Sequence, residues 1–360
     1  MLYVGMDIHK RFSQVAVIDQ SGEVMDRRRL NHTPYEELTT YFNQFPKDTQ
    51  VIMEPTCGWS WLSDYISNLG LEVILAHPLK VRLIAESQIK TDKVDALVLA
   101  QLQRTGFLPR AYLAPPEVRK LRELIRCRCR FVRLRTMLKL QIHALLDRLG
   151  ISHQLSDLFG KIGRTFLENL KLESPYQENL FRLLRVIDLL TEEIKQIEKI
   201  IQSRVKKDPQ TKRLMSIPGV GFILAYLFTS EIGDITRFAS AKKLASYCGL
   251  VPSVKQSSNR LHYGHLTKRG NSLLRWGFIE AAHVAIRWNP ELKAWASKIR
   301  AKKGSGVAVC AVARKLVNIV YQLLTQKRDY VKYPSDISKK TKTNRSSRPV
   351  LLLVVPPVAG

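Results

Sequence analysis

The first 112 residues alternate between short apolar runs and amphipathic segments, a pattern typical of an α/β domain. Apolar runs of strand length lie at residues 2–8, 13–19, 24–30, 50–54 and 72–76. Apolar residues at helical spacing predict helices at residues 34–45, 59–68 and 93–104. The order β-β-β-α-β-α-β-α predicts a mixed sheet covered by helices.

Residues 113–205 have a different pattern, which begins after Pro115-Pro116. Two long stretches, at residues 117–149 and 176–205, carry apolar residues at helical spacing, and shorter helices are expected between them. Two such stretches predict an antiparallel coiled-coil arm.

A third, mostly helical block is predicted at residues 206–326. The sequence Ile217-Pro218-Gly219-Val220-Gly221 precedes an apolar helix and resembles the turn of a helix-hairpin-helix motif. Further helices are expected at residues 238–247 and 272–286, with a polar loop at residues 255–259 between them. The remaining residues, rich in Lys, Arg, Ser and Pro, predict a basic flexible tail. The predicted parts of the chain are therefore residues 1–112, 113–205, 206–326 and 327–360.

The charge is distributed unevenly along the chain, whose formal net charge is +27. Residues 1–112 hold 12 basic and 13 acidic residues, whereas the remainder holds 46 basic and 18 acidic residues. An excess this large predicts a polyanionic partner, by default nucleic acid. A membrane surface is the lesser alternative. No apolar run is long enough to span a bilayer.

The five cysteines are scattered, which fits a reducing cytosol better than a disulfide framework. No signal-peptide pattern precedes the first predicted strand. We therefore expect a cytoplasmic protein.

Four carboxylates lie at positions suited to one site. Asp92 and Asp95 are three residues apart at the start of a predicted helix, so both can face one point. Asp7 lies near the end of the first predicted strand, and Glu54 ends the fourth. If these strands are parallel neighbours, both carboxylates lie at the carboxyl edge of the sheet, where α/β sites form.

Such a group of carboxylates predicts a divalent metal site. Like charges held together are unfavourable unless a cation lies between them. Oxygen ligands without a nearby cluster of His or Cys favour Mg²⁺ or Mn²⁺ over zinc, and two such ions can clamp a scissile phosphate. The alternative is that Asp92 caps an exposed helix and that the other carboxylates are ordinary ends of elements.

The motifs around these carboxylates resemble a known family. Gly5-Met6-Asp7-Ile8-His9-Lys10, Glu54-Pro55-Thr56 and Lys90-Thr91-Asp92-Lys93-Val94-Asp95-Ala96 are similar to motifs of the DEDD-type insertion-sequence transposases. That family has a RuvC-like N-terminal domain and is related to the Piv DNA invertase. The resemblance extends to about residue 326. It implies an α/β ribonuclease H-like domain, then a helical coiled-coil arm and a mostly α C-terminal domain.

The third block carries the second part of the resemblance. Gly249-Leu250-Val251-Pro252, a serine loop and Thr267-Lys268-Arg269-Gly270-Asn271 match the family's C-terminal domain in order and approximate spacing. The family usually has Ser-Gly in the loop, and Ser258 stands where that glycine would be. The order of the elements aligns the nucleophile with Ser257, and Ser258 stays a competitor. An ordinary surface loop is the alternative.

Basic side chains and glycines are the predicted nucleic-acid contacts. Those in the first long helix are Arg122, Arg126, Arg130 and Arg133. Their alternative role is a solvated helix face. Gly219 and Gly221 would let backbone N–H groups approach a phosphate, or would form a purely structural turn. Lys268 and Arg269 would neutralise phosphate charge, or would be solvated cations at a helix start.

These features together favour a DNA recombinase. A serine hydroxyl needs activation before it attacks a phosphate, and a metal–carboxylate site supplies that activation. The resemblance implies a composite site in a homo-oligomer, a dimer or a tetramer, that moves an insertion sequence in the nucleoid of a bacterium or archaeon. It also implies a structured non-coding guide (bridge) RNA, which would choose the DNA by base pairing.

Other classes of function stay open. A RuvC-like nuclease that uses water, or a site-specific invertase without a guide RNA, is the main alternative. The hairpin that carries Asp7 also resembles the first hairpin of actin-like sugar kinases, but the sequence lacks a second Gly-rich phosphate loop. A non-catalytic DNA-binding protein leaves the four carboxylates unexplained, because carboxylates without a cation repel phosphate.

Overall fold

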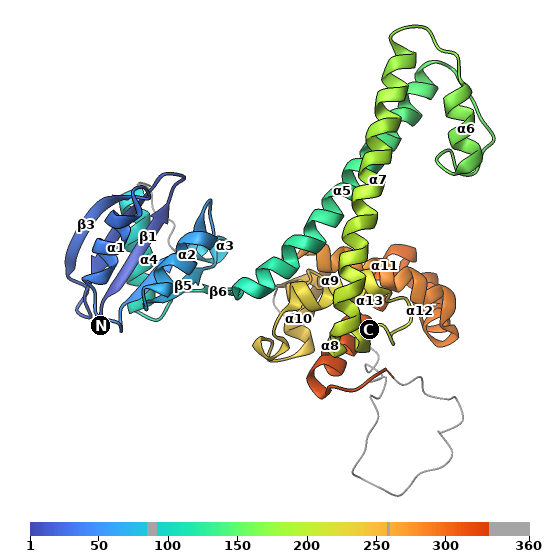
Figure 1. Cartoon of the computed structure of the whole chain (residues 1–360). Helices are drawn as coiled ribbons and strands as arrows, with labels where there is room; N and C mark the ends of the chain where they lie inside the picture. The colour runs from blue at the N-terminus through green and yellow to red at the C-terminus, as the bar shows by residue number, and fades with distance from the viewer. Residues whose placement is uncertain (85–91, 258–259, 331–360) are drawn as a thin grey trace, which may run out of the picture. The chain divides into compact units, whose positions relative to one another are not determined.

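The computed structural model of the chain describes residues 1–84, 92–257 and 260–330 (Figure 1). Of residues 92–93, 255–257 and 260–263 it describes the backbone alone. The predicted tail beyond Tyr330 lies outside the described residues. The chain forms two compact units, Met1–Pro116 and the part from Glu117 onward.

The first unit contains a six-stranded mixed sheet. Its strands are β1 (Tyr3–Ile8), β2 (Phe12–Ile18), β3 (Val24–Asn31), β4 (Gln50–Met53), β5 (Glu72–Ala76) and β6 (Arg110–Ala111). They lie in the order β3-β2-β1-β4-β5-β6. β1, β4 and β5 are parallel to one another, and the remaining pairs are antiparallel.

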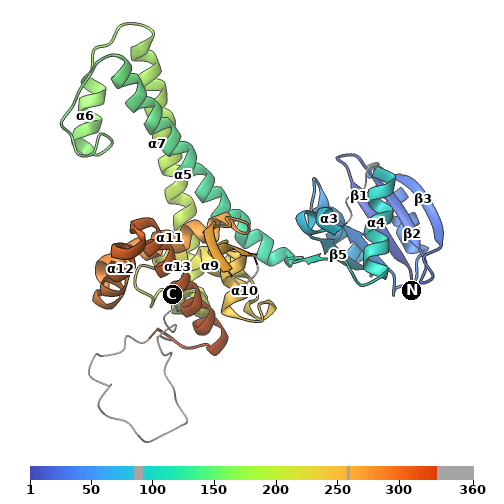
Figure 2. The same cartoon turned by 180° about the vertical axis from the view of Figure 1, so that it is seen from behind.

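Helices cover both faces of this sheet, because its central strands bury side chains on both faces. On one face, Val4, Met6 and Val51 form a core with α1 (Tyr35–Asn43) and α2 (Trp59–Asn68). On the other face, Ile52 and Ile74 form a core with α3 (Pro78–Ile84) and α4 (Asp92–Arg104). Figures 1 and 2 show these faces from opposite sides. The predicted mixed α/β layout is confirmed.

The packing of α4 on β1 depends on Gly5. A Cβ atom added at Gly5 would lie 1.8 Å from the carbonyl oxygen of Ala96 and 2.9 Å from the backbone nitrogen of Ala100. Contacts this short leave no room for any side chain at this position. The backbone of α4 therefore rests directly on the backbone of β1.

Two long helices open the second unit. α5 (Pro116–Arg148) and α7 (Tyr176–Lys207) run antiparallel and lie side by side in both views (Figures 1 and 2). Arg128 donates to Glu198, and farther along the pair Arg135 donates to Thr191. The predicted pair of antiparallel helices is confirmed, and its supercoiled packing stays a prediction. At one end, α6 (Lys161–Asn169) folds back against the pair through a separate apolar core.

The other end of the helix pair is part of a larger helical core. Ile125 of α5 and Ile201 of α7 share this core with Leu227, Phe278 and Val312. The elements that follow α7 are α8 (Pro209–Leu214), α9 (Phe222–Ile232), the 3₁₀ helix η1 (Ile235–Arg237), α10 (Ala241–Tyr247), β7 (Pro252–Ser257), β8 (Arg260–Leu266), α11 (Ser272–Trp288), α12 (Pro290–Lys303) and α13 (Ser305–Gln326). The C-terminal block is therefore mostly helical, as expected.

Two local predictions in this block were wrong. The polar stretch predicted as a loop at residues 255–259 extends a strand as far as Ser257, because it pairs with β8 in a two-stranded antiparallel sheet. The helix predicted from Phe238 begins only at Ala241, because Ser240 takes an extended backbone conformation and caps that helix.

One helix meets the length and composition of a membrane span, which the sequence analysis did not expect. α13 is 22 residues long and apolar. However, half of its most apolar window is buried in the second unit's core, with Ala313, Val317 and Val320 fully covered. This is the pattern of a core helix, for which apolarity has a packing reason.

The contact at Gly5 gives a stability prediction. Gly5→Ala is expected to lower the free energy of unfolding by about 1–3 kcal/mol, because α4 must move away from β1. Gly306→Ala is the control, since a Cβ there meets nothing within 4 Å and Gly306 lies in a helix. Thermal unfolding followed by circular dichroism measures both. An unchanged transition in Gly5→Ala would contradict the contact.

Candidate catalytic site

Asp7 and Glu54 lie at the carboxyl edge of two adjacent parallel strands. The register of β1 and β4 pairs Gly5 with Ile52 and Met6 with Met53. Asp7 and Glu54 are the next residues of the two strands in that register. The hydroxyl of Thr56 donates to the carbonyl of Ile8 at 3.2 Å, which ties the turn after Glu54 to the end of β1. The predicted parallel arrangement of these strands is therefore confirmed.

The helix with the other two carboxylates begins at the same edge. Ala96 rests on Gly5, while Gln101 and Arg104 donate to the carbonyls of Gly22 and Gln20 near the start of β1. α4 therefore runs antiparallel to β1, and its first turn, from Asp92 to Asp95, points toward the edge that carries Asp7. The side chain of Asp95 is half-buried, and that of Asp92 lies outside the description.

The donor set fits a hard divalent cation. Asp7 exposes 22% of its side chain, and its Oδ2 lies 3.1 Å from Nε2 of His9. Among the residues with described side chains, no three His, Cys, Asp or Glu form a metal-binding group. Asp7, Glu54 and Asp95 are among those residues, so their side chains do not converge as a group of three. The type of donor, carboxylate oxygen, is the one that Mg²⁺ and Mn²⁺ prefer. The role of the four carboxylates as metal ligands stays a prediction.

Ser257 is the last residue of β7, at the tip of the β7–β8 hairpin, where its backbone is in register with that of Arg260. Ser258 lies outside the described residues. The carboxylates belong to the first unit and Ser257 to the second.

The turn before α11 holds Lys268 and Arg269 at the surface. The backbone N–H of Asn271 donates to the carbonyl of Tyr247 at 2.7 Å, and Arg275 donates to the carbonyl of Lys268 at 2.9 Å. Gly270 has a φ of +118°, and a Cβ there would lie 2.3 Å from the Tyr247 carbonyl oxygen. These contacts fix the backbone of the turn, while the side chains of Lys268 and Arg269 stay exposed.

Glu231, which the sequence analysis missed, connects α5 to the turn before α11 through its carboxylate. Its side chain is fully buried in the last turn of α9. Arg126 donates to its two carboxylate oxygens at 2.6 and 2.9 Å, and Asn271 donates to one of them at 2.7 Å. The signal in the sequence was an acidic residue within the apolar stretch of residues 222–232. A buried charge of this kind requires a partner.

Arg122 and Arg126 therefore have structural partners. Arg122 donates to the backbone carbonyls of Ser230 and Glu231. Burial lowers the pKa of Arg122, whereas the hydrogen bond to Glu231 raises the pKa of Arg126. Both guanidinium groups stay charged at any physiological pH. Their nucleic-acid role stays a prediction, now beside an observed function of joining α5 to α9.

The other predicted nucleic-acid residues differ in their exposure and in the contacts they make within the protein. Arg130 pairs with the exposed Glu123 at 2.5 Å, and the side chain of Arg133 is exposed. Gly219 has a φ of +86°, and a Cβ there would lie 2.5 Å from the Ala281 carbonyl oxygen, so its close approach is to α11. Gly221 is exposed at the start of α9, and a Cβ there would meet nothing within 4 Å.

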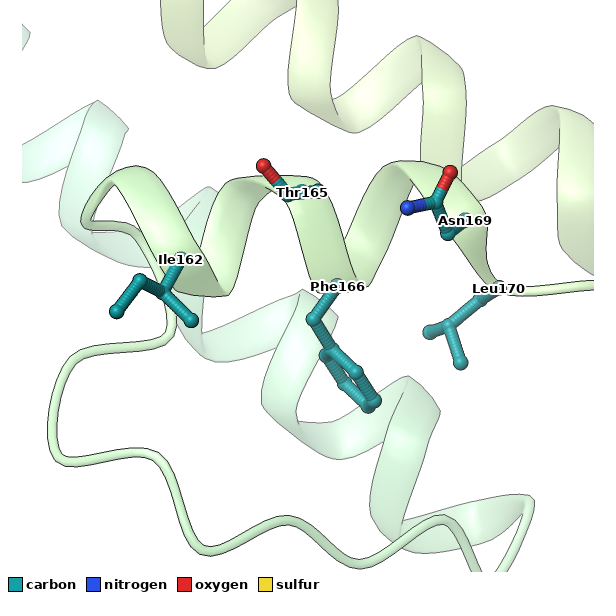
Figure 3. Close-up of a pocket in the computed structure, with 5 residues that line it drawn as sticks. All are labelled: Ile162, Thr165, Phe166, Asn169 and Leu170. Atoms are coloured by element: carbon teal, nitrogen blue, oxygen red, sulfur yellow. The ribbon is translucent and has the colours of Figure 1, made fainter.

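A surface depression of about 530 Å³ lies along α6 and carries no catalytic group. It is lined by Ile162, Thr165, Phe166, Asn169 and Leu170. Figure 3 shows Ile162, Phe166 and Leu170 projecting from the same side of the helix. None of the five side chains titrates in the range useful for acid–base or metal chemistry. The sheet edge with Asp7 and Glu54 is therefore the stronger candidate site.

Comparison with known families gives two matches along the chain. A transposase family model of the DEDD type matches residues 4–151, which include the carboxylate edge and α4. A second model, described as the transposase IS116/IS110/IS902 family, matches residues 211–296, which include α9, the β7–β8 hairpin and α11.

Curated relatives match nearly the whole chain. The transposase for insertion sequence element IS1328 of Yersinia enterocolitica is 27% identical over 327 residues, covering 90% of this chain and 96% of the relative. The transposase for IS1111A of Coxiella burnetii is 27% identical over 342 residues, covering 91% and 90%. The pilin gene-inverting protein of Moraxella bovis is 26% identical over 340 residues, covering 92% and 98%.

The chain thus matches a DEDD-type transposase domain over most of the first unit and on through α5 of the second. The second unit contains the domain of the IS116/IS110/IS902 family. The chain therefore carries, in order, the two domains of the IS110/IS116 transposases.

The buried ion pair gives a second stability prediction. Glu231→Ala is expected to lower the free energy of unfolding by about 3–5 kcal/mol, because it leaves the half-buried Arg126 without its carboxylate. Glu198→Ala is the matched control. It removes a partly exposed partner of Arg128 on the same helix pair, and about 1 kcal/mol or less is expected. Urea unfolding measures both losses, and equal losses would contradict the anchoring role of Glu231.

Proposed function

We propose that this protein is a DNA recombinase that moves an insertion sequence by cutting and rejoining DNA through a serine nucleophile. The observation that carries the proposal is the carboxyl edge of the first unit. There, Asp7 and Glu54 lie at the carboxyl ends of adjacent parallel strands, and the first turn of α4 points toward them. This is the arrangement expected of a metal-assisted phosphoryl-transfer site.

The carboxylates would hold Mg²⁺ or Mn²⁺ and orient a DNA phosphate. Asp7, Glu54, Asp92 and Asp95 are the ligands we assign. The bound ions would neutralise charge that develops on the phosphate oxygens. Because phosphate and carboxylates repel each other, the DNA would bind productively only with the cation present.

Ser257 would supply the nucleophile. Its Oγ attacks the phosphorus and forms a phosphoserine bond, while the bond from phosphorus to the 3′-oxygen breaks. The serine proton passes to a carboxylate, and the departing 3′-oxygen takes up a proton to leave as a free 3′-hydroxyl. Attack by an incoming 3′-hydroxyl on the phosphoserine reverses the step and rejoins the DNA. Lys268 and Arg269, exposed on a fixed turn, would bind the phosphate charge.

The site would be completed by assembly and by RNA. The carboxylates and Ser257 belong to different units, so we assign a composite site in a homo-oligomer, a dimer or a tetramer. The pair α5–α7 would act as its coiled-coil arm. We further assign a structured non-coding guide RNA, which would select DNA by base pairing in the nucleoid. The excess of 46 basic over 18 acidic residues beyond residue 112 supports a nucleic-acid partner.

A RuvC-like nuclease or a site-specific invertase without guide RNA is the second candidate. The carboxylate edge alone suffices for a nuclease that uses water. The likeness to a pilin gene-inverting protein favours the invertase.

A trapped adduct tests the chemistry. The full chain, with its bound nucleic acid, Mg²⁺ and labelled DNA from the flanks of its gene, is expected to give a denaturant-stable protein–DNA adduct. Asp7→Asn is expected to reduce the adduct more than about 100-fold, since loss of a metal ligand exceeds the effect of an outer-shell change. Asp48→Asn, an exposed carboxylate at the opposite edge of the sheet, is the control and should retain it.

The serine variants decide the nucleophile in the same assay. Loss of the adduct in Ser257→Ala, with retention in Ser258→Ala, is the expected result. An adduct that persists in the double variant would exclude the serine mechanism. Cleavage without any adduct would favour the nuclease.

The guide RNA is tested by purification from the native host. A single structured RNA, with loops complementary to DNA flanking the gene, is expected to remain bound at moderate salt. DNA alone, or an unselected RNA mixture, would favour the invertase or the nuclease.

A further inference from the structure

The edge strand β3 carries a cationic segment that the proposed function does not use. Arg27, Arg28 and Arg29 are consecutive and exposed, whereas the rest of residues 1–112 holds nine basic and 13 acidic residues. Their side chains alternate between the two faces of the sheet, so their neighbours differ.

Arg29 lies in the same row of the sheet as Asp7. The register pairs Asp7 with Gln14 across β1 and β2, and Gln14 with Arg29 across β2 and β3. Residues directly opposite in a sheet project from the same face. Arg29 therefore lies on the face that carries Asp7. Two strand spacings separate their backbones by roughly 10 Å.

A continuous stack connects Arg29 to the carboxylate. The guanidinium carbon of Arg29 lies 3.8 Å from the centre of the Phe12 ring. Phe12 stacks in turn on His9, with ring centres 4.5 Å apart and planes 22° apart. Nε2 of His9 lies 3.1 Å from Oδ2 of Asp7. A fixed cation thus stands at one end of the stack and the candidate metal ligand at the other.

This stacking suits phosphate binding. A guanidinium that lies over an aromatic ring can still use its N–H donors for bidentate contact with a phosphate. The ring also restricts the side chain before the ligand arrives, so less conformational entropy is lost on binding. Arg28 also lies over a ring, that of Tyr41 at 4.9 Å, but it projects from the opposite face of the sheet and pairs with Asp26 at 2.6 Å.

We propose that Arg29, held on Phe12, binds a backbone phosphate of the DNA strand that is cut at the Asp7 site, and that the Phe12–His9 stack positions it. This rests on the proposed function for the identity of the strand. With one phosphate per 3.4 Å of a strand, the bound phosphate lies within about three phosphates of the scissile one.

The proposed ligand of Arg29 is DNA rather than RNA, because the stack ends at Asp7, which belongs to the site proposed to cut DNA. A second role for charged residues on β3 is to keep an edge strand from pairing with other chains. That role requires charge alone, without the Phe12 stack, and Arg27 and Arg28 also satisfy it.

The test is a binding cycle with the full chain, its bound nucleic acid, and flanking DNA in Ca²⁺. Arg29→Ala is expected to weaken DNA binding about tenfold and to reduce the slope of log affinity against log salt by about one. Arg28→Ala removes the same charge from the same strand on the opposite face and is expected to change affinity less than about twofold. Phe12→Leu, which keeps Arg29 but removes the ring, is expected to give an intermediate loss.

DNA with one neutral methylphosphonate at each position in turn then locates the contact. When the methylphosphonate replaces the phosphate that Arg29 contacts, at one or two adjacent positions, Arg29→Ala should not weaken DNA binding further. The negative charge that Arg29 would bind is already absent there. The proposal would be overturned if the losses of affinity from Arg29→Ala and from the methylphosphonate were additive at every position. It would also be overturned if Arg28→Ala and Arg29→Ala weakened DNA binding equally. An effect on RNA oligonucleotides alone would also overturn it.

This experiment is independent of strand cleavage. If Asp7→Asn cut DNA normally while the methylphosphonate cycle still located Arg29, the proposed catalytic site would fail and the phosphate contact would stand.

Discussion

The direct contact between the backbones of β1 and α4 determines the geometry of the candidate site. Gly5 has no side chain, so the carbonyl of Ala96 can lie where a Cβ atom would otherwise be. This close approach fixes the height and the direction of α4 over the sheet. Because α4 runs antiparallel to β1, its first turn points toward the edge that carries Asp7 and Glu54. The same contact thus serves packing and brings the start of α4 to the edge where, in our proposal, four carboxylates hold a divalent cation.

The second unit depends on a different constraint, a buried charge. Glu231 has no contact with solvent, and its carboxylate needs the hydrogen bonds it accepts from Arg126 and Asn271. Those partners come from α5 and from the turn before α11. One side chain therefore connects the base of the long helix pair to the turn that presents Lys268 and Arg269. Removing one partner of such a pair is costly because the other charge stays uncompensated, whereas replacing the whole pair with apolar residues is often neutral.

Local sequence patterns predicted much of the first unit. Apolar runs gave β1 to β5, and the spacing of Asp92 and Asp95 gave the start of α4 to within one residue. α3 was not predicted, although it begins with Pro78 and proline is favoured in the first turn of a helix. The short β6 is defined only by its pairing with β5, which no local pattern records.

The errors in the second unit come from contacts distant in sequence. Strand β7 contains polar residues, and its structure comes from pairing with β8 rather than from an apolar pattern. Arg122 and Arg126 have the sequence signature of a solvated basic face, because their partners in α9 lie more than 100 positions away. The row that joins Asp7 to Arg29 likewise depends on the register of three strands. The periodicity of apolar residues predicts which face of a helix or strand is buried. It does not predict which distant residues contact that face.

The central claim is that the carboxyl edge of the first unit binds a catalytic divalent cation. Its most direct test is a titration of the full chain with Mn²⁺, with and without flanking DNA, followed by electron paramagnetic resonance. The account predicts that the unaltered protein and Asp48→Asn bind Mn²⁺ alike, and that Asp7→Asn and Glu54→Gln each lose that binding while remaining folded. Equal Mn²⁺ binding by Asp7→Asn and the unaltered protein would contradict it.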